Sequence, residues 1–366
     1  MDLDNFVRPD VAAMEAYTPI VPFEVLSRRL GRAPDEITKL DANENPYGPS
    51  PRALAALGAG KYYHIYPDPE ALELREALGA YTAVSPAHLM AGMGADELID
   101  LVLRVVLAPG DVVVDCPPSF GMYPFSTAVN SGQYVPVRRR ADFSLDVDGI
   151  ETAVHAHKAK VLILCSPNNP DGSTIDDDTL RRLLKLPVLV LLDEAYADFA
   201  ELDGYRSHLD WAPKVENLAV LRTFSKLAGL AGLRVGYGAF PEWLLPHMWK
   251  IKQPYNINVA ASLAALASLE DTTWLREKVG LIVQERKRMV AELARFAWLQ
   301  PYPSQSNFVL FRVLERDARQ LKLALEQQGV LVRYFNKPGL DNCIRISAGR
   351  PSDTDRLVAA LVEIGD

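Results

Sequence analysis

The sequence has few cysteines, with three among 366 residues, at Cys116, Cys165 and Cys343. They form no CxxC pair, so neither a disulfide scaffold nor a cysteine zinc site is expected. Two of the three lie within or beside apolar, strand-like runs, as buried thiols often do in reducing compartments. We therefore expect a cytoplasmic protein.

Long hydrophobic runs and an excess of positive charge are also absent. No stretch approaches the ~20 apolar residues that a membrane helix needs, and Met1–Asn5 has neither the basic nor the apolar part of a signal peptide. The net charge is -8, and the only tight cationic run is Arg138–Arg140, which we interpret as a solvated strand end. Neither a membrane nor a nucleic acid is therefore expected as a partner.

Histidine is scarce as well. The chain has six histidines, and they show none of the spacings that zinc sites favour. His155 and His157 fall in a polar helix end, where a solvated pair is the simpler interpretation. No metal site is therefore expected.

What the chain does have is 49% hydrophobic residues, enough to fill sizeable cores. From about residue 90 to 240, short apolar runs alternate with helical patterns, which is typical of an α/β domain with a mostly parallel sheet and crossover helices. The expected strands are Val112–Asp115, Gln133–Val137, Val161–Cys165, Val188–Leu192, Leu218–Arg222 and Arg234–Ala239. The expected helices are Ala95–Leu107, Ser119–Asn130, Asp148–Lys158 and Asp176–Leu186.

Beyond Pro254 the pattern changes to long helical stretches, followed by an order of strands and helices that predicts a smaller α+β domain. The proline-rich N-terminal segment could add an arm to it. We expect an arm over residues 1–43, a large α/β domain over 44–258, and interdomain helices with a small domain over 259–366. The expected elements of this last part are Val259–Leu269, Thr273–Ala297, Phe308–Val313, Ala318–Gln328, Val330–Arg333, Cys343–Ser347 and Asp353–Ile364.

The segment Thr223-Phe224-Ser225-Lys226 follows an expected strand, and a run of small residues then leads to Arg234. A lysine in such a site can lose its proton through desolvation or neighbouring cations, which makes its amine a Schiff-base nucleophile. Ser225 and Arg234 would then bind a phosphate. The alternative is a surface lysine beside a glycine-rich turn.

The apolar run Val188–Leu192 ends in Asp193-Glu194-Ala195-Tyr196. This places a carboxylate at the carboxyl end of a buried strand, where ligands bind in open α/β sheets. A pyridoxal 5′-phosphate (PLP) enzyme needs such a carboxylate, because it keeps the pyridine nitrogen protonated. Tyr196 could bind the phenolic oxygen of the same ring. Alternatively, Asp193 caps the following helix.

Two turns are expected at the same edge of the sheet. Ser166–Gly172 breaks the chain sharply and presents Asn169, although the motif could be only a turn. Gly92–Glu97 precedes a helical pattern, so the backbone N–H groups of Ala95 and Asp96 could hold a phosphate.

Two arginines lie in expected strands near the C-terminus. Arg345 is flanked by apolar residues in Cys343–Ser347, and such an arginine is costly to bury unless it meets an anion. Its planar fork fits an α-carboxylate. Arg333, in Val330–Tyr334, is a second arginine of this kind. A salt bridge within the small domain is the alternative for each.

Together these motifs resemble those of the fold-type I, PLP-dependent aminotransferases, and more closely those of the histidinol-phosphate aminotransferases. The resemblance covers nearly the whole chain. Its most specific pieces are Asn43-Glu44-Asn45-Pro46, Tyr66-Pro67-Asp68, Gly94-Ala95-Asp96-Glu97, Ser166-Pro167-Asn168-Asn169-Pro170, Asp193-Glu194-Ala195-Tyr196, Thr223-Phe224-Ser225-Lys226 with Arg234, Val332-Arg333 and Ile344-Arg345-Ile346-Ser347.

The resemblance implies PLP as cofactor and Lys226, Asp193 and Tyr196 as catalytic residues. Lys226 would carry the cofactor as a Schiff base and move the substrate proton, while Asp193 would pair with the pyridine nitrogen. Tyr196 and Asn169 would bind the phenolic oxygen. The other residues implied to bind the cofactor are Ala95, Asp96, Glu97, Ser225, Arg234, Tyr66 and Phe120, which stands where the family usually stacks a tyrosine.

The resemblance also implies partners and a substrate site. Tyr66 would reach the active site of a second subunit, which implies a homodimer. Arg345 would bind the α-carboxylate of glutamate, and Arg333 the phosphate of histidinol phosphate. Tyr17 and Asn45 would line the substrate site.

The implied reaction is transamination of L-histidinol phosphate with 2-oxoglutarate, a step of histidine biosynthesis. An aromatic or broad-specificity aminotransferase, and a PLP-dependent decarboxylase of a phosphorylated amino acid, are the alternatives. A PLP-binding transcription regulator would need a DNA-binding module, for which the ~40 residues before Asp41 are too few. The chain departs from the family at Asp171, usually a threonine, and at Pro19–Pro22, where many relatives have Pro-Gly-Lys-Pro.

Overall fold

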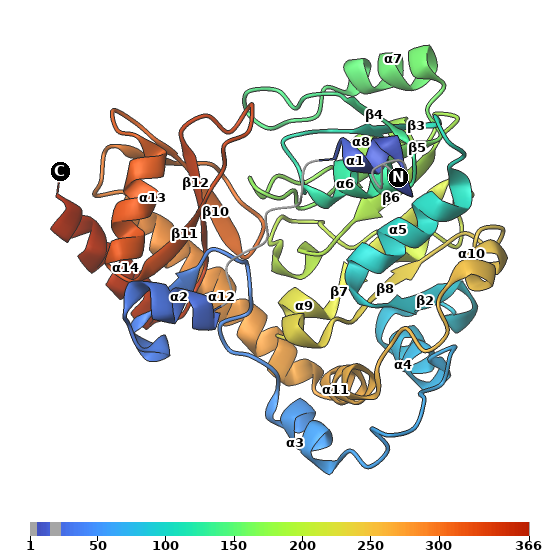
Figure 1. Cartoon of the computed structure of the whole chain (residues 1–366), viewed down its shortest axis with the longest axis horizontal. Coiled ribbons are helices and arrows are strands. Elements are labelled where there is room, and N and C mark those ends of the chain that lie inside the picture. The colour runs from blue at the N-terminus through green and yellow to red at the C-terminus, as the bar shows by residue number, and fades with distance from the viewer. Residues whose placement is uncertain (1–5, 15–22, 366) are drawn as a thin grey trace.

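The computed structural model describes residues 6–14 and 23–365, which form two sheets with helices packed around them (Figure 1). The strands of the larger sheet are β2 (Leu89–Gly92), β3 (Val112–Asp115), β4 (Gln133–Pro136), β5 (Val161–Cys165), β6 (Leu189–Asp193), β7 (Leu218–Thr223) and β8 (Gly236–Ala239). Their order is β2-β8-β7-β6-β5-β3-β4. The strands from β4 to β7 pair in parallel, whereas β8 is antiparallel to both of its neighbours. The prediction of a mostly parallel sheet is confirmed.

The central strands are apolar throughout because both faces of the sheet are covered. In β5, Val161 and Ile163 belong to one core cluster, whereas Leu162 and Leu164 belong to another. Successive side chains of a strand point to opposite faces, so each face has its own core. The helices of this part are α3 (Pro51–Ala59), α4 (Leu72–Thr82), α5 (Gly94–Val106), α6 (Met122–Val129), α7 (Val147–His157), α8 (Asp177–Leu183), α9 (Phe224–Leu227), α10 (Leu245–Ile251) and α11 (Val259–Leu269).

The second sheet combines C-terminal strands with one strand from the N-terminal segment. Its strands are β1 (Thr38–Leu40), β9 (Leu299–Pro301), β10 (Phe308–Val313), β11 (Val330–Tyr334) and β12 (Cys343–Ser347), in the order β1-β11-β12-β10-β9. β1 runs parallel to β11, with Thr38 opposite Val330. The remaining helices are α1 (Pro9–Ala12), α2 (Phe23–Leu30), α12 (Thr272–Leu293), α13 (Ala318–Gln327) and α14 (Pro351–Ile364). The N-terminal segment therefore completes the smaller sheet.

The predicted elements are all present, with ends that shift by a few residues. The interpretation of Arg138–Arg140 as solvated is confirmed for Arg138 and Arg140, which are exposed, but it is wrong for the residue between them. Arg139 is buried rather than solvated, with 8% of its surface exposed. Its guanidinium donates to the carbonyl oxygens of Cys116, at 3.1 Å, and Phe143, at 3.0 Å. These backbone acceptors replace water, which is why the arginine tolerates burial.

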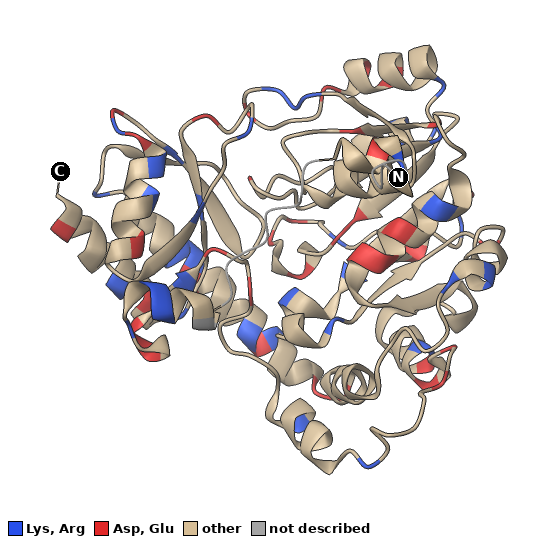
Figure 2. Cartoon of the chain, in the orientation of Figure 1, with Lys and Arg blue, Asp and Glu red and all other residues tan. Residues whose placement is uncertain are grey.

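Charged residues of both signs are dispersed along the helices around both sheets (Figure 2). No helix in residues 6–14 and 23–365 combines the length and apolarity needed to cross a membrane. Over the same residues, no cluster of three His, Cys, Asp or Glu side chains could hold a metal ion. All three cysteines are free and buried.

Candidate active site

The predicted motifs meet at the carboxyl edge of the larger sheet. Asp193 ends β6, and the turn that begins at Ser166 follows the neighbouring strand β5. The Ser166 N–H donates to the Asp193 carbonyl oxygen at 2.9 Å, which joins the two strand ends. β7, on the other side of β6, leads directly into α9 and Lys226. Parallel strands thus bring residues from distant parts of the sequence to one edge.

Lys226 lies on α9, a single turn that begins at a threonine cap. The hydroxyl of Thr223 accepts a hydrogen bond from the Ser225 N–H at 3.1 Å. The Lys226 amine donates to the Ala42 carbonyl oxygen at 3.2 Å. Burial, and then the positive charge of Arg345, lower the pKa of Lys226 to about 8. Its amine therefore loses a proton far more easily than that of an ordinary surface lysine.

Asp193 is a buried carboxylate held by two hydrogen bonds. Its Oδ1 accepts from the Ala195 N–H at 3.0 Å, and its Oδ2 accepts from the Tyr123 hydroxyl at 2.7 Å. Burial raises the pKa of Asp193 to about 6, against the opposing effect of these hydrogen bonds. Among the described residues, no lysine or arginine forms an ion pair with Asp193. A cationic group bound beside it would stabilise its ionised form.

Tyr123 is a site residue that the sequence did not reveal. It lies fully buried on α6, and its ring meets the Phe120 ring edge to face, with centroids 5.6 Å apart. Phe120 itself is half-buried. An aromatic residue in a helix is most simply a core residue, so only its contact with Asp193 distinguishes Tyr123.

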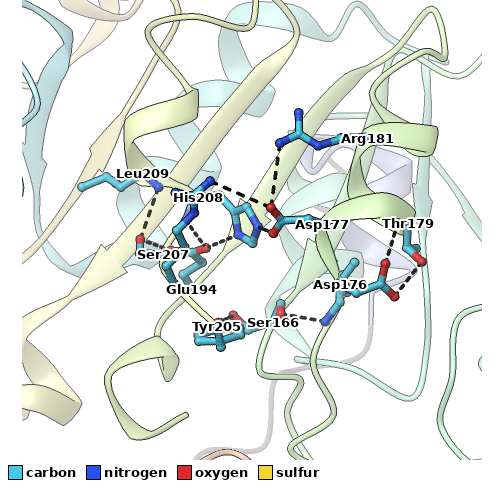
Figure 3. A network of polar contacts seen from close by, with 12 residues as sticks. Ser166, Asp176, Asp177, Thr179, Arg181, Glu194, Tyr205, Ser207, His208 and Leu209 are labelled. Carbon is cyan, nitrogen blue, oxygen red and sulfur yellow. Dashed lines mark hydrogen bonds and ion pairs between the residues drawn. The ribbon is translucent and has the colours of Figure 1, made fainter. Parts of the chain in front are cut away.

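Glu194, the residue after Asp193, belongs to a network of hydrogen bonds and ion pairs with Ser207, His208 and Asp177 (Figure 3). The His208 ring is 1% exposed and lies between two carboxylates, with Nδ1 at 2.9 Å from Glu194 Oε1 and Nε2 at 3.0 Å from Asp177 Oδ1. Glu194 also accepts from the His208 N–H at 2.8 Å and from the hydroxyl of Ser207. Both ring nitrogens face acceptors, so the doubly protonated ring fits this place.

The His208 network predicts a stability that depends on pH. Burial disfavours the charged ring, but hydrogen bonds and attraction from Glu194 and Asp177 outweigh it and raise the pKa of His208. A raised pKa in the folded state stabilises the protein fully below the unfolded pKa of about 6.5, and this contribution disappears as the pH rises through the folded value. We expect His208→Gln to lower the free energy of unfolding by about 2 kcal/mol at pH 6 and by much less at pH 9.

Urea unfolding at the two pH values measures this difference. The exposed His247 on α10 provides the control, because His247→Gln removes a histidine outside the network. A loss for His208→Gln that is equal at pH 6 and pH 9 would contradict a charged His208.

Tyr196 and Asn169 have partners from the smaller sheet and the N-terminal segment. The Tyr196 hydroxyl accepts from Asn43 Nδ2 at 3.0 Å. Burial raises the pKa of Tyr196 well above its ordinary value, so the hydroxyl keeps its proton. Asn169 Oδ1 accepts from Arg345 Nη1 at 2.5 Å. Residues that the sequence placed in separate domains therefore touch.

The predicted phosphate-binding residues surround the beginning of α5. Arg234 Nη2 donates to Asp96 Oδ2 at 3.0 Å. A Cβ on Gly94 would lie 2.6 Å from Arg234 Nη2, and one on Gly236 would lie 2.7 Å from the Ala95 nitrogen. Glycine suits both positions, because Gly94 has a positive φ of 76° and a Cβ on Gly236 would collide with the backbone at the start of α5. The structure thus places Arg234 beside the N-terminal amides of α5, while their role as phosphate ligands stays a prediction.

Four further predicted residues have definite places, and one lies outside the described residues. Ser225 Oγ accepts from Thr223 Oγ1 at 2.9 Å. The carboxylate of Glu97 accepts from the Met93 N–H at 2.6 Å and from Asn256 at 2.7 Å, so it caps α5. Asn45 donates to the carbonyl oxygens of Lys226 and Leu227. Tyr66 is 80% exposed and stacks on Tyr255. Tyr17 and Pro19–Pro22 lie outside the described residues.

Arg333 and Arg345 stand directly opposite each other in the antiparallel pair β11 and β12. Both guanidinium groups also lie near the Phe335 ring, at 5.8 and 5.5 Å from its centroid. Like charges directly opposite in a sheet repel each other. The arrangement therefore favours an anion beside the two arginines.

The comparisons with known proteins agree with this geometry. The family model "Aminotransferase class I and II" matches residues 35–361. The chain belongs to this family of aminotransferases, and its fold is that of the fold-type I, PLP-dependent transferases.

Several similar proteins are histidinol-phosphate aminotransferases. The chloroplastic enzyme of Nicotiana tabacum is 52% identical over 359 residues, which cover 98% of this chain and 86% of that protein. The enzyme of Roseiflexus castenholzii is 50% identical over 370 residues, which cover 99% of each. The histidinol-phosphate aminotransferase of Sinorhizobium meliloti, in complex with PLP, superposes with a TM-score of 0.89 at 31% identity and covers 98% of this chain and 97% of that one.

The chain is an aminotransferase whose cofactor is PLP. Its described residues fit this cofactor. Lys226 offers an amine with a pKa of about 8, and Asp193 offers a buried carboxylate without an ion-pair partner among the described residues. The glycine-lined end of α5 leaves Arg234 and backbone amides for the phosphate.

Proposed function

We propose that the chain transfers the amino group of L-histidinol phosphate to 2-oxoglutarate, giving imidazole-acetol phosphate and glutamate in histidine biosynthesis. The cross-strand pair of Arg333 and Arg345 is the observation that carries this proposal. The amino donor, histidinol phosphate, bears a phosphate, and the amino acceptor, 2-oxoglutarate, bears carboxylates. Guanidinium groups bind either kind of anion with several hydrogen bonds. The similarity to histidinol-phosphate aminotransferases over nearly the whole chain supports the same substrate.

Each site residue has a separate role in the proposed reaction. Bound PLP supplies an electron sink that makes the proton on the amino-bearing carbon acidic. Lys226, with its lowered pKa, removes and returns that proton at the substrate carbon. Asp193 holds a positive charge on the pyridine nitrogen. Asn169 and Tyr196 bind the phenolic oxygen of the cofactor.

The substrate anions are held from the smaller sheet. Arg345 binds the α-carboxylate of glutamate beside Asn169, with which it already shares a hydrogen bond of 2.5 Å, whereas the phosphate of histidinol phosphate is bound by Arg333. Arg333 adds the second guanidinium on the neighbouring strand. Because histidinol phosphate and 2-oxoglutarate occupy this one site in turn, the amino group must be stored on the enzyme between them, which gives ping-pong kinetics.

A half-reaction tests the substrate. The PLP form of the enzyme is mixed in turn with histidinol phosphate, phenylalanine and threonine phosphate, and conversion to the pyridoxamine form is followed by absorbance. Rapid conversion by histidinol phosphate alone is expected. An equal rate with phenylalanine would overturn the substrate while leaving the aminotransferase class intact, and carbon dioxide release from threonine phosphate would indicate a decarboxylase.

Arg333→Ala is expected to weaken phosphorylated donors selectively. Losing a hydrogen bond to a charged group costs about 1.5–3 kcal/mol, which corresponds to a fall of about 10- to 150-fold in kcat/KM for histidinol phosphate. Steady-state kinetics with histidinol phosphate and with glutamate as donors measure it. The exposed Arg312, on β10 of the same sheet, gives the control variant Arg312→Ala. An equal fall for both donors would contradict the phosphate role of Arg333.

We also propose a cytoplasmic homodimer, in which Tyr66 reaches the partner's cofactor. The segment around Tyr66 is rich in exposed apolar side chains, and the exposed fractions are 64% for Tyr62, 52% for Tyr63, 52% for Ile65 and 80% for Tyr66. Contiguous exposed apolar residues favour a protein interface. Three free, buried cysteines suit a reducing compartment.

A further inference from the structure

Asn43 lies in the loop after β1, where three parts of the chain meet. It is 1% exposed and has a positive φ of 56°, a conformation that asparagine tolerates better than most residues. Its N–H donates to Ser347 Oγ at 2.9 Å, and its carbonyl oxygen accepts from Asn307 Nδ2 at 2.8 Å. Both backbone polar groups of Asn43 are thus held by the smaller sheet.

The hydrogen bonds also determine which way the Asn43 amide points. Ser347 Oγ accepts from the Asn43 N–H and donates its own proton to Asn43 Oδ1, at 3.1 Å. This leaves Nδ2, a donor, facing the Tyr196 hydroxyl at 3.0 Å. A reversed amide would remove the acceptor of the Ser347 proton, so the pattern as a whole favours the orientation described.

The donor on Asn43 restricts what the Tyr196 hydroxyl can do. One lone pair of its oxygen is occupied by Nδ2, so its proton must be donated in another direction. Because burial raises the pKa of Tyr196, that proton stays on the oxygen. Accepting a hydrogen bond also polarises the O–H group and strengthens it as a donor. A cofactor oxygen beside Tyr196 would receive this proton.

The same loop is attached to the strand that carries Arg345. Ser347 and Arg345 both lie on β12, and Arg345 Nη2 donates to the Asp41 carbonyl oxygen at 2.8 Å. β12 therefore holds residues 41–43 at two points, and Asn43 extends this contact to Tyr196, which follows β6 of the larger sheet.

We propose that Asn43 is a positioning residue that directs the Tyr196 proton toward the phenolic oxygen of PLP. Because Ser347 of β12 orients Asn43, this direction depends on the position of β12. The proposal rests on the role assigned above to Tyr196 in the proposed function. It goes beyond that role because it names the group that orients the hydroxyl and the strand that holds this group.

The test uses the absorbance of the holoenzyme without substrate. The cofactor absorbance changes with pH, and its midpoint depends on how strongly the phenolic oxygen is stabilised as an anion. Asn43→Gly keeps the positive φ and the backbone hydrogen bonds while removing Nδ2. We expect it to raise the midpoint by about half to one pH unit, and we expect Asn43→Asp, which replaces the donor by an anionic acceptor, to raise it further.

The Tyr196→Phe background separates positioning from a structural role. If Asn43 acts through the hydroxyl, Asn43→Gly shifts the midpoint in the wild-type background and leaves it unchanged beside Tyr196→Phe. Equal shifts in both backgrounds, or no shift in either, would overturn the proposal. Ser347→Ala, which removes the group that orients the amide, is expected to give a smaller shift in the same direction. Since no amino donor is present, an error in the substrate assignment would leave this measurement unaffected.

Discussion

Lys226→Ala is expected to lower amino transfer by at least about 10⁴-fold. The variant loses both the nucleophilic amine and the group that moves the substrate proton, and proton transfer by a positioned side chain alone contributes about 10²- to 10⁴-fold. The pKa of about 8 means that this amine loses its proton far more easily than that of an ordinary surface lysine. Half-reaction kinetics with histidinol phosphate measure the loss.

Borohydride reduction of the PLP form gives an independent measurement for the same residue. It should trap the cofactor on Lys226 in the wild-type protein and yield no adduct in Lys226→Ala. Lys250→Ala is the control, because Lys250 is exposed on α10. An adduct on another lysine of the wild-type protein would refute the assignment of Lys226.

Asp193→Asn should have the second largest effect. We expect it to lower kcat and to raise the stability of the apoprotein. In the proposed mechanism the carboxylate stabilises the charge on the pyridine nitrogen, and removing a stabilising group of this kind costs about 10²- to 10³-fold in kcat. In the apoprotein, however, burial raises the pKa of Asp193 from 3.8 to about 6, so the ionised carboxylate is unfavourable there. Asparagine avoids that penalty.

The pH dependence of this stability has a definite sign. A folded-state pKa above the unfolded value means that the folded apoprotein binds a proton more tightly, so Asp193 destabilises it as the pH rises through about 6. We expect apo Asp193→Asn to be more stable than the wild type by about 1–3 kcal/mol at pH 7.5 and by almost nothing near pH 3.

Chemical unfolding of the two apoproteins at both pH values, alongside kcat of the holoenzymes, measures these effects. Tyr123→Phe, which removes only the hydrogen bond to Oδ2, should change both quantities in a milder way. A variant Asp193→Asn that is less stable than the wild type at pH 7.5 would show that Asp193 is a structural residue.

The sequence predicted most strands of both sheets well because they are short apolar runs. β3, β5, β10 and β12 begin and end where the pattern placed them. The pattern missed β1, β2 and β9, which have three, four and three residues. A strand that short has too few residues for an alternation to be recognised, and β1 forms only because β11, almost 300 residues later, pairs with it.

The candidate site divides in the same way. Lys226, Asp193 and Asn169 were predictable because each follows a strand, and the carboxyl ends of parallel strands meet at one edge. Tyr123 and Asn43 were not predictable, because their partners lie 70 and 153 residues away in the chain. Arg139 was predicted wrongly because carbonyl acceptors, which a sequence does not display, hold it in the interior.

The sequence by itself determined most of the strands, the class of fold and the place of Lys226 after a buried strand, since these depend on local periodicity and on residues at strand ends. Only the tertiary structure decided which groups contact these residues. Tyr123 forms a hydrogen bond with Asp193, Asn43 forms one with Tyr196, and Arg333 lies opposite Arg345 in the sheet. The reason is physical. A side chain's pKa and hydrogen-bond direction depend on burial and on neighbours within a few ångströms, and folding brings those neighbours from distant parts of the chain.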